Sequence, residues 1–419
     1  MIKQISIFIL AVLSSFMLYA QENYVADVKV QGNEKLKISF VKKMAAVKSG
    51  DVLDSLLLEE DMKLLKRLPS VSHAYYQVFQ NEEGTYNVFY NIEENFTLIP
   101  SVNFYTTDND EFAYRLGLYE FNTFGRNIIF GGFYQKDVYD SHAINIRAPF
   151  LFSKHWGLAA NYQDLTTQEP VFFEDETAQY KYNNESYEIL GLYQYDFHNR
   201  IEFGINYFIE DYRFKGENSN NRPELRVDKW LAKGIYEYNN LDYFYHFVSG
   251  FRSILNFQYV TSSNDMLPDF FIGWNDFFYF KRIGKNGNWA NRLRIGLSTN
   301  DETPFAPFSV DNNINVRGVG NTIDRGTGTI VLNTEYRHTL YEKNWFVLQG
   351  NAFVDAGTWR NPGGDFGNFS KKDNVKIYPG LGLRFIHKKI YNAIFRIDYG
   401  YGISENATKG FVFGIGQYF

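Results

Sequence analysis

From residue 98 to residue 419 the chain is a succession of short segments in which apolar and polar residues alternate, and this pattern constrains the fold more than any other feature. Residues 112–122, 127–136 and 142–149 are early examples. Successive side chains of a strand point to opposite faces, so each segment would have one apolar and one polar face. The pattern predicts a mainly β protein whose strands bury apolar residues on one side only.

The connections between these segments are of two kinds. Short turns at one end and long polar loops at the other are typical of an outer-membrane β-barrel. About 320 residues, at roughly 20 for each strand and its loop, predict about sixteen antiparallel strands, since a spanning strand needs ~10 residues. No fixed repeat indicates a propeller. Short turns are expected at 153–155, 196–199, 341–344 and 387–389, and long polar loops at 165–184, 213–227, 261–268, 300–328 and 360–374.

The composition agrees with a barrel better than with a soluble core. Aromatic residues make up 19% of the chain, with 32 Tyr and 40 Phe, although the mean hydropathy is −0.35. Outer-membrane barrels carry aromatic girdles at both membrane interfaces, whereas a soluble core does not need so many tyrosines. The absence of cysteine excludes disulfides and cysteine chemistry. The net charge of −6 gives no basic surface for nucleic acid.

The first twenty residues predict a secretory signal peptide. Lys3 supplies the positive charge, residues 5–18 are mostly apolar, and Ala20 precedes a plausible cleavage site before Gln21. A membrane anchor is the alternative, and the apolar stretch is too short to favour it. No cysteine follows the site, which excludes a lipid anchor.

Residues 21–97 predict a small α+β domain that precedes the barrel. Their alternating and helical spacings give the order β-α-α-β-β. Asp54 is expected to cap the second helix, because its carboxylate can accept from free N–H groups of the first turn. The five elements are expected at 25–31, 37–47, 55–67, 71–80 and 86–93.

One loop of the barrel region carries a lone arginine, Arg317, in the polar segment 312–321. Alternation in the two following strand-like segments places Glu335 and Asp355 on their polar faces. If that face lines a closed barrel, Arg317 can fold inward and meet one or both carboxylates. A guanidinium suits this role because it binds a carboxylate through two parallel hydrogen bonds. An ordinary loop arginine is the alternative.

The motif Val316-Arg317-Gly318-Val319, a strand bearing Glu335, and then Phe353-x-Asp355-x-Gly357 resemble the outer-membrane assembly family of BamA and TamA. In that family the loop arginine locks against acidic residues of the inner barrel wall. The resemblance therefore implies a locking motif formed by residues 316–319 with Glu335, Asp355 and Gly357. The fourth position of the motif is usually aromatic in the family, and here it is Val319.

The N-terminal segment resembles a POTRA domain, the periplasmic module of the same family. The element order, the Val-Gln-Gly-Asn turn at 30–33 and the Leu-Pro-Ser-Val-Ser stretch at 68–72 carry this likeness. Another small α+β domain is the alternative. The chain contains one such segment, where general assembly machines of the family usually carry several. The resemblance implies that unfolded client proteins add a strand to the edge of residues 71–80, at Val71, Tyr75 and Val78.

The last strand-like segment resembles the C-terminal signal of outer-membrane barrels. Alternation places Phe411, Phe413, Ile415 and Phe419 on one face. In the family the last strand pairs only loosely with the first, and glycines weaken a strand further. The residues that this resemblance assigns to such a seam are Val102, Phe104, Gly414, Gly416 and Phe419.

The resemblance implies an outer-membrane insertase or translocase with its POTRA domain in the periplasm of a Gram-negative cell. Its expected partners are unfolded outer-membrane or secreted proteins, the lipid bilayer with lipopolysaccharide, and accessory lipoproteins. A channel that secretes one dedicated partner, a passive pore, and an anchor for a lipoprotein complex remain as alternatives.

Motifs of enzymes and metal sites are missing from the sequence. The seven histidines show no metal-ligand spacing, and no nucleophile elbow or phosphate-binding loop is present. We therefore expect no enzyme, no cofactor and no metal. The acidic cluster 108–111 could bind a cation weakly, but a hairpin turn is the favoured interpretation. Basic residues of the two predicted helices are expected on a solvated face, namely Lys42, Lys43, Lys63, Lys66 and Arg67.

Overall fold

The computed structural model describes residues 23–106, 112–136, 138–172, 177–216, 223–264, 267–300, 306–310, 315–319, 324–404 and 407–419. The predicted signal peptide at 1–20 and the predicted acidic turn at 108–111 lie outside these residues. In the described part of the chain, no helix has the length and apolarity needed to cross a membrane.

The N-terminal domain has the predicted order β-α-α-β-β. Its three-stranded sheet has β3 in the centre, parallel to β1 and antiparallel to β2. Asp54 caps α3 as expected, since its side chain accepts from the N–H groups of Leu56 and Leu57. The elements are β1 (Val25–Gln31), α2 (Ile38–Met44), α3 (Ser55–Lys66), β2 (Val71–Gln80) and β3 (Tyr86–Glu94).

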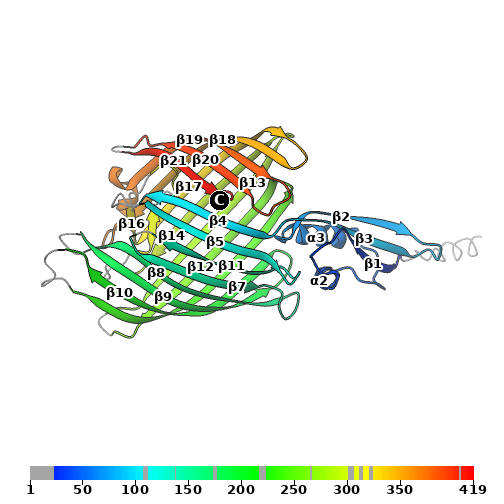
Figure 1. The fold of residues 1–419 in the computed structure, drawn as a ribbon, viewed down its shortest axis with the longest axis horizontal. Coiled ribbons are helices and arrows are strands. Elements are labelled where there is room, and N and C mark those ends of the chain that lie inside the picture. The colour runs from blue at the N-terminus through cyan, green and yellow to red at the C-terminus, as the bar shows by residue number, and fades with distance from the viewer. Residues whose placement is uncertain are drawn as a thin grey trace, which may run out of the picture.

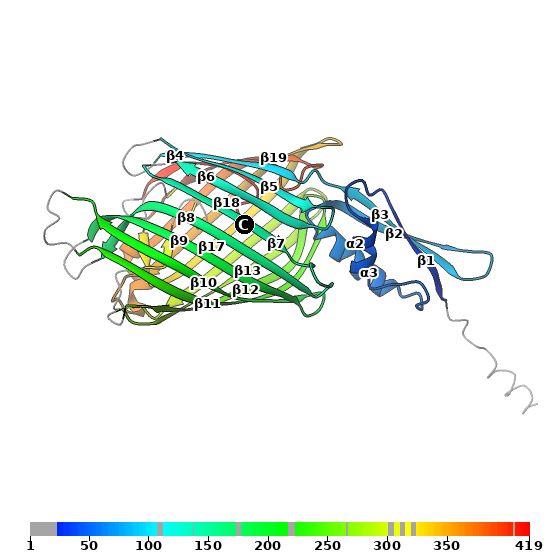
Figure 2. The same ribbon diagram turned by 60° about the horizontal axis from the view of Figure 1, so that its bottom comes forward.

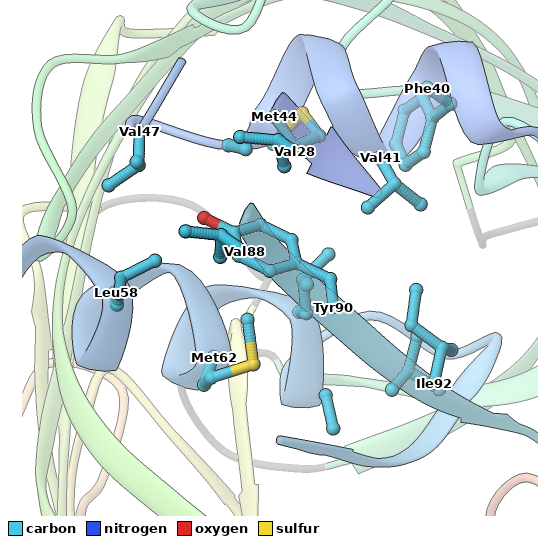
Figure 3. Packing of buried hydrophobic residues seen from close by; sticks show 14 of the residues in the cluster. Val28, Phe40, Val41, Met44, Val47, Leu58, Met62, Val88, Tyr90 and Ile92 are labelled. Atoms are coloured by element: carbon cyan, nitrogen blue, oxygen red, sulfur yellow. The ribbon is translucent and has the colours of Figure 1, made fainter. Parts of the chain in front are cut away.

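The core of this domain lies between the sheet and the two helices. Val41 and Met44 of α2 and Leu58 of α3 approach Tyr90 of the central strand (Figure 3). The hydroxyl of the buried Tyr90 donates to Asp61 at 2.6 Å, and the same carboxylate accepts from the N–H groups of residues 46 and 47. Burial and the nearby carboxylate raise the pKa of Tyr90. A buried carboxylate held in this way fixes the loop after α2.

The rest of the described chain forms one sixteen-stranded sheet that curls into a nearly closed barrel (Figures 1 and 2). All the ladders in it are antiparallel, and each joins strands that follow one another around the wall. This confirms the predicted fold class and strand number. The strands are β4 (Leu98–Thr106), β5 (Phe112–Thr123), β6 (Ile128–Lys136), β7 (Asp140–Ala148), β8 (Trp156–Phe172), β9 (Thr177–Gln194), β10 (Asn199–Phe214), β11 (Leu225–Phe244), β12 (Phe247–Ser262), β13 (Phe270–Ile283), β14 (Gly287–Ser298), β17 (Gly328–Glu342), β18 (Phe346–Arg360), β19 (Val375–His387), β20 (Ile394–Tyr401) and β21 (Lys409–Ile415).

Two long connections contain short elements of their own. The connection from β14 to β17 includes a small two-stranded sheet, β15 (Phe308–Val310) with β16 (Asp324–Gly326). The connection from β18 to β19 includes the 3-10 helices η2 (Phe366–Ser370) and η3 (Lys372–Asn374).

Alternation sorts the barrel side chains as the sequence predicts. On β7, Ile144 and Ile146 are exposed on the outer face, whereas Arg147 points inward and pairs with Glu202 of β10. An exterior that exposes so many large apolar side chains suits lipid and not water. Other examples on the outer face are Ile189, Ile201, Phe203, Ile205, Leu255 and Phe257.

The prediction of a long polar loop at 165–184 is wrong. β8 continues to Phe172 and β9 begins at Thr177, so most of this stretch is strand. The ladder satisfies the backbone groups here, and the scattered apolar side chains Val171, Ala178 and Tyr180 pack together in a buried cluster. Hydropathy alternation therefore does not mark these strand ends.

The N-terminal domain lies at one end of the barrel, against the turns of its rim (Figure 1). Arg67 donates to the main-chain oxygens of Leu241 and Phe197, with its guanidinium 4.3 Å from the Phe197 ring centroid. Lys66 pairs with Asp242 at 2.6 Å, and Lys43 donates to a main-chain oxygen of the turn after β7. The predicted solvated basic face is thus wrong for these three residues, because the end of β11 and two turns of the barrel supply partners from elsewhere in the chain.

Candidate functional site: the loop lock and the seam

The side chain of Arg317 lies against the inner wall of the barrel and is 0% exposed. Its Nε and Nη2 donate to the two oxygens of Asp355 at 2.8 and 3.0 Å, and its Nη1 donates to Glu335 at 2.7 Å. The main-chain N–H of Arg317 also donates to Asp355 at 3.0 Å. The structure thus brings the loop arginine together with both acidic residues that alternation places inside. Charge-assisted bidentate geometry of this kind fixes both the position and the orientation of the loop.

A wider set of buried charges surrounds this arginine. Glu335 also accepts from Arg337 and from Arg384, the latter at 2.9 Å. Asp398 of β20 lies 3.5 Å from Nη1 of Arg317 and also pairs with Arg396. No side chain of this group is more than 9% exposed. We call these seven residues the lock network: Arg317, Glu335, Arg337, Asp355, Arg384, Arg396 and Asp398.

Aromatic rings cover the guanidinium of Arg317. The ring centroid of Phe353 lies 3.6 Å from its Cζ, and that of Tyr418 lies 4.6 Å away. Both rings are buried. An aromatic face attracts a cation more strongly where water is excluded. The carboxylates therefore hold the edge of the guanidinium while rings shield it from water.

Glycines let the loop approach the wall. Gly318 has φ +93°, and a Cβ on it would lie 2.6 Å from the main-chain oxygen of Gly400 on β20. A Cβ on Gly400 would in turn lie 2.1 Å from the main-chain oxygen of Arg317. A Cβ on Gly357 would lie 2.9 Å from Val310. Only residues without a side chain permit such backbone contact.

Apolar packing and one hydroxyl hold the remaining loop residues. Val316 and Val319 are buried in a cluster with Val310, Trp359 and Tyr378. Thr408, which immediately precedes β21, donates to the main-chain oxygens of residues 318 and 319 at 3.2 and 2.8 Å. The loop therefore contacts β17, β18, β20 and the residues next to β21. It lies on the side of the last strands.

The first and last strands, β4 and β21, meet at the seam. The two strands lie next to each other, but over their described lengths they share no ladder, whereas each of the other neighbouring pairs does. Near the N-terminal domain the seam is bridged. There Phe96 donates to the main-chain oxygen of Lys389 at 2.9 Å and accepts from Tyr391 at 3.0 Å. Val102 and Phe104 lie on β4, and Gly414 lies on β21.

The chain leaves the wall directly after β21. Gly416 has φ +91°, and its N–H donates to the main-chain oxygen of Ile394 at 2.8 Å. Phe419 then packs against an inner cluster that contains Leu241 and Phe280. The prediction that Phe419 shares the outer face of Phe411 is therefore wrong. Alternation holds only while the backbone stays extended, and a glycine with positive φ ends it.

The predicted client-binding strand β2 is an edge of the three-stranded sheet. Tyr75 on it is 44% exposed, whereas Val71 is buried and Val78 packs against the core. An edge strand presents unpaired backbone groups to another chain. The binding of clients at this edge stays a prediction.

Several residues of the site were not predicted from the sequence. Arg337 shares the parity of Glu335, and Arg396 and Asp398 are the polar positions of an alternating strand, so parity could have found them. Tyr418 carried no such signal, because its position follows the turn at Gly416. Among the described residues no group of three or more His, Cys, Asp or Glu side chains is arranged to hold a metal ion.

Comparisons with known proteins agree with this architecture. Residues 23–95 match the family model described as "POTRA: Surface antigen variable number repeat". No curated protein sequence matches the chain. The solved structure of CdiB from Escherichia coli is similar over 94% of this chain and 77% of its own, with 11% identity and a TM-score of 0.64.

Two further solved structures share the fold. CdiB from Acinetobacter baumannii matches 95% of this chain and 74% of its own, at 14% identity and a TM-score of 0.59. BamA from Haemophilus ducreyi lacking POTRA domains 1–3 matches 94% of this chain and 84% of its own, at 14% identity and a TM-score of 0.56. The POTRA match and these solved structures confirm the resemblance in fold to proteins that join POTRA domains to an outer-membrane barrel, BamA and CdiB among them.

Proposed function

We propose that this protein inserts unfolded β-barrel clients into the outer membrane at the seam between β4 and β21. The observation that carries the proposal is the missing ladder between these two strands, in a sheet whose other neighbouring strands are paired. In hydrocarbon no water can satisfy the free backbone groups, so an under-paired edge favours the addition of a new strand.

In this proposal the barrel spans the outer membrane of a Gram-negative cell and the POTRA domain lies in the periplasm. The apolar outer face of the barrel supports the placement in a bilayer. The POTRA domain would receive a client along the edge of β2, and β4 would then offer its free backbone groups to the last strand of the client. Folding of the client supplies the free energy, so no nucleotide is required.

The lock network would brace the barrel on the β21 side of the seam. Arg317 links the loop to β17 and β18 through Glu335 and Asp355, and Gly400 places the loop against β20. A wall held firmly behind the last strands lets the seam open without unravelling the rest of the barrel. The lock is therefore proposed as a structural support of insertion and not as a binding site.

The direct test is a disulfide across the seam. The chain has no cysteine of its own, so a small scan can pair cysteines at Ser101 or Val102 with cysteines at Val412 or Phe413. Proteoliposomes containing the oxidised pairs should fail to insert a urea-unfolded barrel client, and reduction should restore insertion. The matched control joins Ala160 to Ile189, which are already ladder partners in β8 and β9. Full insertion by seam-locked protein would falsify the seam mechanism.

Depletion in cells tests the breadth of the function. A fall of many outer-membrane barrels, with unfolded precursors in the periplasm, is the expected result for an insertase. Loss of a single surface or secreted protein, with the others unchanged, would instead identify a dedicated secretion channel. Steady ion conductance of the purified barrel, without effect on any client, would indicate a passive pore.

A further inference from the structure

The strand β21 is attached to the loop of Arg317 at both of its ends. Before the strand, Thr408 donates to the main-chain oxygens of Gly318 and Val319. After the strand, the backbone turns inward at Gly416, and the ring of Tyr418 reaches the guanidinium of Arg317. The loop is thus in contact with the chain on either side of the last strand of the wall.

Tyr418 has two cationic neighbours from different parts of the chain. Its ring centroid lies 4.6 Å from Cζ of Arg317, which belongs to the loop, and 4.8 Å from Cζ of Arg396, which belongs to β20. The residue is 7% exposed. Arg317 cannot move away without giving up this ring, and the segment after β21 cannot leave the lumen without uncovering the guanidinium.

We propose that Tyr418 is a positioning residue that couples the last strand to the loop lock, so that β21 and the loop of residues 315–319 are released together. Through this coupling, release of β21 at the seam also weakens the contacts of Arg317 in the lock network. It concerns the purified chain alone and does not depend on the insertase proposal, which requires a client.

A tyrosine that merely fills space would behave differently. Coupling is reciprocal: if removal of the ring loosens the loop through its contact with Arg317, then a change at Arg317 that removes the same contact must also loosen the segment after β21. A space-filling residue would affect its own surroundings and leave the loop unchanged. Replacement by leucine keeps apolar volume but removes the aromatic face, so leucine and phenylalanine distinguish the two roles.

The experiment is hydrogen–deuterium exchange of the full chain in nanodiscs, read on peptides that cover residues 315–319 and 409–419. Tyr418→Ala and Tyr418→Leu should speed exchange in both segments by about 5-fold or more, the lower range of a typical coupling. Tyr418→Phe should stay near wild type. Phe413→Ala is the matched control, because it removes a ring that is 62% exposed on the same strand and should leave the loop unchanged.

The reciprocal arm uses Arg317→Lys, which keeps the charge and removes the planar face. It should speed exchange in residues 409–419, and the double variant Tyr418→Ala with Arg317→Lys should exchange little faster than the stronger single variant. Unchanged loop exchange in both Tyr418→Ala and Tyr418→Leu, or additive effects in the double variant, would overturn the proposal. If Tyr418→Ala does not fold, the comparison of leucine with phenylalanine decides alone.

Discussion

Two walls of the barrel lumen carry ion-pair networks of similar chemistry in different surroundings. Across β17 to β20, the lock network keeps Arg317 and its carboxylates at 0% side-chain exposure. Across β7 to β12, a second network keeps its arginines 28–32% exposed. We call the second one the wet network: Arg147, Arg200, Glu202, Glu237 and Arg252. Both walls pair arginine with a buried carboxylate, Glu202 and Glu237 being 5% exposed, and they differ in the access of the arginines to water.

The difference in access decides what each network can do. A buried pair gains a strong attraction but has lost the hydration of both partners, so removing one partner leaves an uncompensated charge. A partly exposed arginine that loses its carboxylate regains water instead. The lock network therefore fixes one arrangement of the loop, whereas the wet network keeps a charged lining with little effect on the position of any segment.

The largest effect is expected for Arg317→Ala. The loss of one partner from a buried network typically costs about 3–5 kcal/mol of the free energy of unfolding. We expect the barrel still to assemble, with a lower urea midpoint and slower client insertion in proteoliposomes. The control is Arg147→Ala in the wet network, which should change both far less. Wild-type insertion by Arg317→Ala would remove the lock from the proposed mechanism.

A smaller effect is expected where the loop backbone touches the wall. In Gly400→Ala the new methyl group would lie 2.1 Å from the main-chain oxygen of Arg317. Overpacking of this kind typically costs about 1–3 kcal/mol of the free energy of unfolding. On the opposite wall a Cβ on Gly234 would meet nothing within 4 Å. Gly234→Ala should therefore be neutral in the same urea titration, and equal losses in the two variants would contradict the close approach.

Much of the site could be predicted because strand parity is a local property. Glu335 and Asp355 lie in the regular part of the β17–β18 ladder, because its register shift falls between Thr339 and Tyr341, so their inward orientation follows from sequence spacing. The bounds of β1 and β2 agree with the prediction for the same reason, since turn residues bracket each alternating run. The resemblance of the Arg317 motif to a known family supported the prediction that this loop residue meets Glu335 and Asp355.

The remaining features depend on contacts between distant parts of the chain. Tyr418 reaches Arg317 only because Gly416 turns the backbone inward, and no spacing rule predicts the direction of that turn. The partners of Arg67 are main-chain oxygens of β11 and of the turn after β9, more than a hundred residues away. The strand ends at 165–184 were missed because their few apolar residues, Val171, Ala178 and Tyr180, come together only through the ladder and their contacts with β10. Tertiary contact and not local pattern determines these features.

The junction of the POTRA domain with the barrel contains histidines that are less buried than the lock network. Acid should therefore weaken the docking of the domain. His246, in the turn after β11, contacts Thr339 at 3.1 Å, and burial lowers its pKa to about 4. His73 stacks on Tyr245 across the junction at 4.9 Å, and burial also lowers its pKa. An unfolded histidine takes up a proton near pH 6.5, before the folded one does.

Stability at the junction is therefore complete above about pH 6.5 and is lost as the pH falls toward 4, since in that window the unfolded state binds more protons. The measurement is the rate of proteolytic release of the POTRA domain as a function of pH. The rate should rise on acidification in the wild type and rise less in His73→Gln, which removes the ring that stacks on Tyr245 across the junction. A flat pH profile would show that these histidines do not contribute to docking.

The smallest effect is expected in the wet network. Glu237→Gln removes the carboxylate that faces Arg200 and Arg252, and both arginines already contact water. Because the arginines keep contact with water, the pairs should contribute about 1 kcal/mol to the free energy of unfolding, the upper range for exposed pairs since Glu237 itself is buried, and high salt should reduce this contribution. The matched change in the lock network is Glu335→Gln, which leaves the guanidinium groups of Arg337 and Arg384 buried beside a neutral amide. Urea titrations of both variants at low and high salt measure the contrast. Equal, salt-insensitive losses would mean that exposure does not separate the two walls, and that the apparent wetness of Arg200 and Arg252 has no energetic consequence.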